Sequence, residues 1–131
     1  MMEIEFYDPN LLDKNLKATA HKSGKLGFTV DAANKLELSQ EKSIGIGHDK
    51  SNPADKNLYV VVYNENRPHA FKVNKAGLYY YVNMKPLFDT LKIDYKKESV
   101  VFDIAEHGHI DGHKLYRFEK REKKQKMNLV D

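Results

Sequence analysis

Residues 26–46 have the sequence LGFTVDAANKLELSQEKSIGI, and this stretch decides the expected fold. Its apolar residues first alternate with other residues, as on a half-buried strand. Asp31 is a good helix N-cap, and Ala32–Leu38 has the composition of two short helical turns. Alternation returns at Ile44 and Ile46, which predicts a second strand. The apolar residues of the first strand are Leu26, Phe28 and Val30.

The flanking sequence extends this pattern in both directions. Leu16–Ala20 alternates and precedes a Ser23-Gly24 turn, while Leu58–Tyr63 is apolar on both faces, as expected for a central strand. After residue 70 the same order returns. Strands are predicted around Phe71 and Val73, at 78–82, at 100–104 and at 115–118, with a helix at 84–91 capped by Asn83 and a polar loop at 106–112.

Residues 16–63 and 70–118 therefore share the order β-β-α-β-β. When the two stretches are aligned, Leu26 corresponds to Leu78, Phe28 to Tyr80 and Val30 to Val82. A duplicated unit would give one strand-rich α+β domain, a curved sheet or partly open barrel with two short helices. The alternative is a coincidence of generic strand patterns. We expect a single domain over residues 1–118 and a basic tail over 119–131.

The N-terminal residues Glu3–Phe6 alternate between acidic and apolar side chains. This pattern predicts a short edge strand that, with Pro9–Leu12, covers an open edge of the sheet.

Composition narrows the function classes. The 131 residues include no Cys, which excludes disulfide scaffolds and thiolate zinc sites. There is no apolar run long enough to span a membrane, and the start does not resemble a signal peptide, so a cytoplasmic protein is expected. The net charge of +3 arises at residues 114–126, where seven basic residues face two acidic ones. This charge is explained either by a solvated tail or by a tail that contacts the phosphates of a nucleic acid.

Residues 24–46 resemble the swapped-hairpin element of AbrB-type bacterial transcription regulators. In that family a Gly-basic dipeptide precedes an alternating strand, a short helix and a second strand. Here these parts are Gly24–Val30, Asp31–Leu38 and Ser43–Ile46. The resemblance implies the backbone topology of this family and a DNA-binding function. Thr29 replaces the family's usual proline, Ala33 and Asn34 replace its usual arginines, and Lys25 is retained.

The tandem order also resembles that of small uncharacterised bacterial proteins with a Gly-Lys-[Leu/Ile]-x-Phe-[Ser/Thr] start and a late Asp-Gly loop. A bacterial, phage or mobile-element origin is therefore expected.

The densest polar cluster lies between the last two predicted strands. Imidazole and carboxylate groups at this spacing can hold zinc, nickel or copper, and glycines let the loop fold around an ion. An ordinary Asp-Gly turn between two strands explains the same sequence. The candidate ligands are His107, His109, Asp111 and His113.

Tyrosines are concentrated on the predicted strands, with lysines nearby. Aromatic residues on an open sheet can stack on the bases of single-stranded nucleic acid, while lysines contact its phosphates. Packing, or a self-association surface, would use the same tyrosines. The candidate nucleic-acid contacts are Lys25, Lys72, Lys75, Tyr79, Tyr81, Lys120 and Arg121.

No nucleophile elbow, metalloprotease motif or catalytic cysteine is present, and the Gly45-Ile46-Gly47 segment lacks the rest of a phosphate loop. We therefore expect a non-enzymatic protein without a cofactor, a small-molecule substrate or a membrane partner. It would bind nucleic acid or act in regulation. The alternative is a homo-oligomeric assembly module with no nucleic-acid role.

Overall fold

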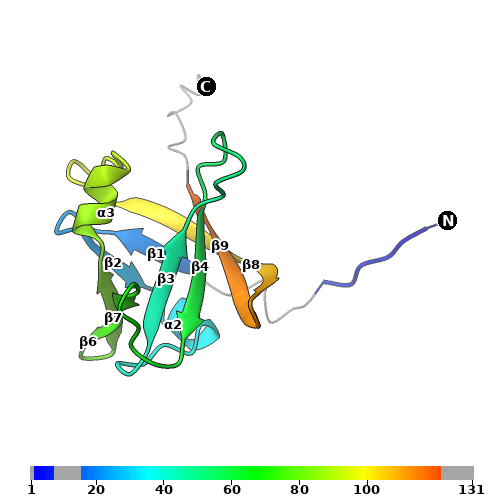
Figure 1. Cartoon of the computed structure of the whole chain (residues 1–131), viewed down its shortest axis with the longest axis horizontal. Coiled ribbons are helices and arrows are strands. Elements are labelled where there is room, and N and C mark those ends of the chain that lie inside the picture. Colours follow the sequence, from blue (N-terminus) through cyan, green and yellow to red (C-terminus); the bar gives the residue numbers. More distant parts are fainter. Residues whose placement is uncertain (1, 8–15, 122–131) are drawn as a thin grey trace, which may run out of the picture.

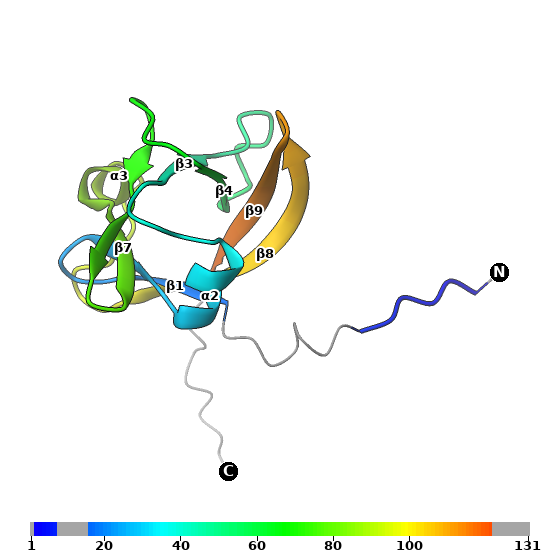
Figure 2. The same ribbon diagram turned by 90° about the horizontal axis from the view of Figure 1, so that it is seen from below.

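A computed structural model describes residues 2–7 and 16–121 of the chain. Nine antiparallel strands and two short helices are found in these residues, and the sheet curves into a nearly closed barrel (Figures 1 and 2). The expected strand-rich α+β class is confirmed. The elements are β1 (Lys17–Ala20), β2 (Lys25–Phe28), α2 (Val30–Lys35), β3 (Ser43–Gly47), β4 (Leu58–Tyr63), β5 (Phe71–Lys72), β6 (Asn74–Ala76), β7 (Tyr79–Asn83), α3 (Lys85–Thr90), β8 (Val100–Ile110) and β9 (His113–Lys120).

The barrel is closed by one short segment of chain. The strand order is β5-β3-β4-β9-β8-β1-β2-β7-β6, so β5 and β6 are the two ends of the sheet. They are separated in sequence only by Val73. β5 pairs with β3, β6 pairs with β7, and the Val73 N–H donates to the Lys42 carbonyl at 3.2 Å. The two ends of the sheet are thereby joined covalently.

Alternation along the strands separates an apolar interior from an outer face. Tyr80 and Val82 of β7 face the interior, whereas Tyr79 and Tyr81 face outward, as the period of two predicts. Burying large apolar side chains is the main stabilising contribution to such a barrel. The large side chains that are almost fully buried include Leu26, Ile44, Val60, Phe88, Phe102 and Phe118.

The prediction of a polar loop at 106–112 is wrong, because β8 continues as a strand to Ile110. A two-residue turn, Asp111-Gly112, then leads into β9, with φ values of 49° and 81°. Asp-Gly favours this hairpin turn because both positions need positive φ. A bulge between Glu106 and His109, where Gly108 has φ 80°, lets the long hairpin bend.

The first helix is displaced from its predicted position, whereas the second lies where predicted and is one residue shorter at each end. α2 spans Val30–Lys35, and its N-cap is Thr29, whose Oγ1 accepts from the Ala32 N–H at 3.2 Å. The assignment of Asp31 as N-cap is therefore wrong, since Asp31 lies within the first turn. α3 spans Lys85–Thr90 and follows Met84 rather than Asn83.

The prediction of an edge strand at Glu3–Phe6 is also wrong. Residues 2–7 form no strand, and Ile4 and Phe6 are 66% and 87% exposed. The sheet ends are joined through Val73 instead. Pro9–Leu12 and the tail beyond Arg121 lie outside the described residues.

Two positions in the expected alignment of the halves differ from the structure. Leu78, matched with the buried Leu26, lies in the β6–β7 turn and is 90% exposed. Val30 opens α2 and is 68% exposed, so it does not continue β2. At the other end of the domain, β9 runs to Lys120, two residues beyond the expected boundary at Phe118.

Phe118→Ala should lower the free energy of unfolding by about 3–5 kcal/mol, the usual cost of emptying a buried phenyl site. Phe118 is 0% exposed and contacts Phe28 edge-on, with ring centroids 6.3 Å apart. Leu78→Ala is the control and should change it by less than about 0.5 kcal/mol. Urea denaturation measures both, and equal effects would contradict this barrel interior.

Candidate functional site

The outer face of β2 and β7 carries a compact aromatic cluster. Tyr79 and Tyr81 alternate with inward residues along β7, so both rings lie on the outer face. Their ring centroids are 5.9 Å apart and their planes differ by 23°, which is a stacked arrangement. We call this surface, with Lys25, Gly27 and the neighbouring His21, the β2–β7 face.

A cation lies directly above the cluster. The Lys25 Nζ is 4.6 Å from the centroid of the Tyr81 ring, within the range of a cation–π interaction. None of the ion pairs found among the described residues involves Lys25. His21 adds a third ring to the cluster, with its centroid 6.2 Å from that of Tyr79.

Gly27 makes room for the Tyr79 ring. β2 pairs with β7, and Gly27 is opposite Tyr81. A Cβ placed on Gly27 would lie 1.5 Å from the Tyr79 hydroxyl oxygen and 2.3 Å from the ring. Burial raises the pKa of the Tyr79 hydroxyl, and the neighbouring Tyr81 adds to this, so the phenol stays protonated near neutral pH.

Not all expected nucleic-acid residues join this face. Lys75 pairs with Tyr80 and lies 5.6 Å from its ring, on the opposite side of β7 from Tyr79 and Tyr81. Lys72 lies on β5, next to β3. The structure thus brings together Lys25, Tyr79 and Tyr81 and leaves the other two lysines elsewhere.

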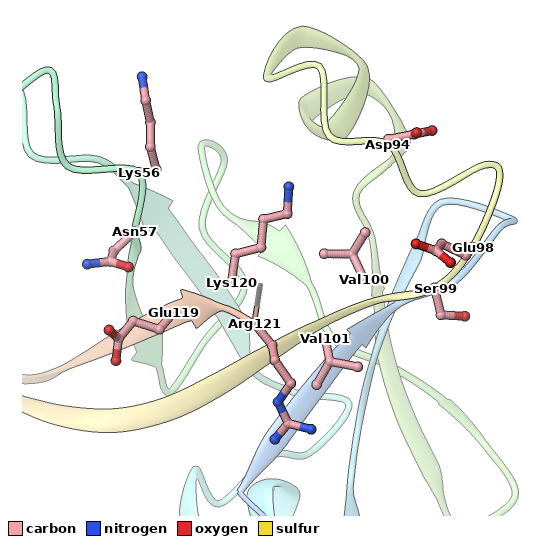
Figure 3. A pocket seen from close by; sticks show the side chains of 10 residues that line it. All are labelled: Lys56, Asn57, Asp94, Glu98, Ser99, Val100, Val101, Glu119, Lys120 and Arg121. Atoms are coloured by element: carbon pink, nitrogen blue, oxygen red, sulfur yellow. The ribbon is translucent and has the colours of Figure 1, made fainter. Parts of the chain in front are cut away.

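Lys120 and Arg121 are also remote, because β8 and β1 separate β9 from β2 in the sheet. They line a pocket of about 830 Å³, where their side chains point in opposite directions (Figure 3). Arg121 donates to the Asp103 carboxylate at 2.7 and 3.2 Å. The pocket also holds the base Lys56 and three acids, Asp94, Glu98 and Glu119. This balance of charge does not favour an anion over a cation.

His107, His109 and His113 of the β8–β9 hairpin each lie beside residues that are not among the candidate metal ligands. The His107 ring lies 5.4 Å from Tyr59, and the His113 ring contacts Tyr63 edge-on at 5.1 Å. His109 pairs with Lys114 in the ladder, and Asp111 lies in the turn. In the described ranges no three His, Cys, Asp or Glu side chains gather where they could hold a metal ion.

Sequence reasoning missed His21 and Gly27. His21 ends the alternating run of β1, on the side that carries Thr19, and this alternation was a usable signal. Gly27 gave no signal by itself, since its role depends on the pairing of β2 with β7.

Comparison with protein-family models, with curated proteins and with solved structures finds no match for this chain.

Gly27→Ala should destabilise the protein by about 1–3 kcal/mol, because the new methyl group forces the Tyr79 ring out of place. Gly47→Ala is the matched control: a Cβ there meets nothing within 4 Å, so we expect a change below about 0.5 kcal/mol. Thermal and urea denaturation compare the two variants. A neutral Gly27→Ala variant would show that Tyr79 does not rest on Gly27.

Proposed function

We propose that this chain is a non-enzymatic protein that binds single-stranded nucleic acid through the β2–β7 face. The observation that carries the proposal is the Lys25 ammonium 4.6 Å above Tyr81, which in turn stacks on Tyr79. Aromatic rings stack on bases of any sequence, and a neighbouring cation contacts the phosphate. Three groups of the required kinds thus lie on one outer face of the sheet.

This arrangement favours single strands over duplexes. Stacking needs a base whose face is exposed, and in a duplex the bases are stacked on one another. Rings and one lysine offer no set of hydrogen bonds to base edges, so little sequence preference is expected. The proposed role is therefore sequence-tolerant binding, with regulation as a consequence of occupancy.

The alternative function, assembly into a homo-oligomer, needs an apolar surface poor in lysine. In residues 16–121 the exposed large apolar residues lie on four separate elements: Val30, Leu78, Leu91 and Ile110. These four residues therefore do not form one apolar stripe along a single helix or strand. The N-terminal residues 2–7 do favour assembly, since Ile4 and Phe6 alternate with acidic residues and are exposed.

Assembly through residues 2–7 predicts a dimer or larger species in solution that becomes monomeric in the double variant Ile4→Ser, Phe6→Ser. Sedimentation equilibrium measures the mass. The nucleic-acid function predicts that this double variant retains full affinity for single strands. Loss of oligomer and of binding together would favour a site shared between copies.

We further infer that the barrel consists of a duplicated β-β-α-β-β unit. Exchanging β1, β2, β3 and β4 with β5–β6, β7, β8 and β9 reproduces the set of strand neighbours. The helices support this correspondence. Each has six residues and ends at a leucine, Leu36 or Leu91, followed by a residue with positive φ, Glu37 or Lys92. The AbrB-type resemblance and the bacterial, phage or mobile-element origin stay predictions.

Tyr81→Leu should weaken binding to a labelled single-stranded oligonucleotide about 5- to 150-fold, equivalent to the loss of about 1–3 kcal/mol of stacking. Tyr81→Phe keeps the ring and should bind like the wild type. Lys25→Gln should weaken binding and reduce the salt slope by about 0.7. Fluorescence anisotropy over a range of salt concentrations measures all three.

The basic tail provides the main control. A variant with Lys123, Lys124 and Lys126 changed to Gln should keep a Tyr81-dependent affinity. If that variant loses all binding while Tyr81→Leu binds normally, the tail binds nucleic acid through charge alone and the proposed face is wrong.

A further inference from the structure

A second aromatic surface lies on the outer face of β3, β4 and β9. A groove of about 600 Å³ crosses it, lined by Gly45, Gly47, Tyr59, Tyr63, Arg67 and His113 among others. The tyrosines occupy the outward positions of β4, whose alternate residues Leu58 and Val60 are buried in the core. We call this surface the β4–β9 face.

The groove exists because β3 carries two glycines on its outer side. Gly45 and Gly47 pair with Val61 and Tyr59 of β4. A Cβ on Gly45 would lie 2.9 Å from the Tyr63 ring, whereas one on Gly47 would meet nothing within 4 Å. Gly45 therefore accommodates the Tyr63 ring, and Gly47 leaves the floor of the groove open.

The Tyr63 ring is contacted by an arginine and by a histidine. The Arg67 guanidinium carbon lies 3.9 Å from the centre of the Tyr63 ring, and His113 meets that ring edge-on. The Arg67 Nε donates to Glu65 at 2.7 Å, which fixes the guanidinium plane. Planar guanidinium groups stack on unpaired bases as aromatic rings do.

Tyr59 is held at the other end of the groove. Its hydroxyl donates to the Asp55 carboxylate, and this hydrogen bond lowers the pKa of Asp55 and raises that of Tyr59. His107 packs on the Tyr59 ring, and its Nδ1 is 3.5 Å from an Arg117 Nη1. The Tyr59 ring is therefore held between His107 and Asp55, whose carboxylate lies at the Tyr59 hydroxyl.

The β4–β9 face resembles the β2–β7 face in the kinds of side chain it carries, but its cation, Arg67, is ion-paired with Glu65. Each has two outward tyrosines, a cation over one tyrosine ring, a histidine beside a ring and glycine on the adjoining strand. β8 and β1 separate the two faces on one side of the barrel, and the β5–β6 segment separates them on the other. They therefore lie on opposite sides, as β7 and β9 do in Figure 2.

We propose that the groove of the β4–β9 face binds a second single-stranded segment, so that one barrel holds two strands at once. This inference rests on the proposed function of the β2–β7 face. Unpaired bases stack on Tyr63 and Arg67 over the open floor at Gly47, and the Arg67 guanidinium faces the phosphates. A small protein built this way bridges two segments of single-stranded nucleic acid.

The test is bridging between two short strands by the full chain. One oligonucleotide of about six nucleotides, near the low end of single-strand site sizes, is fixed on beads and a labelled one is free. The wild type should capture the labelled strand. Tyr63→Leu and Tyr81→Leu should each reduce capture at least about tenfold, a loss of about 1.4 kcal/mol. In anisotropy Tyr63→Leu should keep the affinity of the β2–β7 face, and Tyr81→Leu should still bind one strand through the β4–β9 face with the weakened affinity given above. Tyr63→Phe, which keeps the ring, is the matched control.

The outcomes separate the two proposals. If Tyr81→Leu abolishes all binding and Tyr63→Leu captures normally, the second site is wrong and the proposed function stands. If Tyr63→Leu abolishes all binding and Tyr81→Leu binds one strand in anisotropy as tightly as the wild type, the β2–β7 face is wrong, and so is bridging. Absence of binding by the wild type contradicts both. Capture that needs an oligomer, shown by sedimentation of the same samples, also contradicts bridging by one barrel.

Discussion

The backbone hydrogen bonds on both sides of Val73 determine the rest of this structure. β5 adds to β3, β6 adds to β7, and the single residue between them is fully buried and bonded to Lys42. Without this segment the sheet would have two open edges, each with unpaired N–H and C=O groups. Because the two ends of the sheet are joined at Val73, every long strand has one face in a continuous core and the other on the outside.

Closure converts a simple alternation of residues into outward aromatic surfaces. Val82 is buried in β7, so its neighbour Tyr81 must lie outside, and Val60 in β4 has the same consequence for Tyr59. Outward tyrosines need space over the next strand, and Gly27 and Gly45 provide it. The glycines weaken their own strands slightly, since they contribute no side chain to packing. What they provide is a pair of aromatic faces on opposite sides of one barrel.

Much of this could be predicted from the sequence, within physical limits. The period of two correctly separated Tyr79 and Tyr81 from Tyr80 and Val82. Local rules failed where two signals compete: Thr29 caps α2 although Asp31 is also a good cap, and Gly108 forms a bulge within a strand rather than a loop. Long-range pairing was beyond any local rule. It brings Lys25 to Tyr81 and leaves Lys75 and Lys120 elsewhere, which no spacing along the chain specifies.

The central claim is that outward tyrosines of the closed barrel, rather than charge on the basic tail, hold single-stranded nucleic acid. Backbone amide NMR of the full chain, recorded while a short single strand is added at moderate salt, tests it most directly. The account predicts that the largest shifts fall on Lys25–Phe28 of β2 and Tyr79–Asn83 of β7. Shifts confined to residues after Lys120, or no shifts at all, would contradict it.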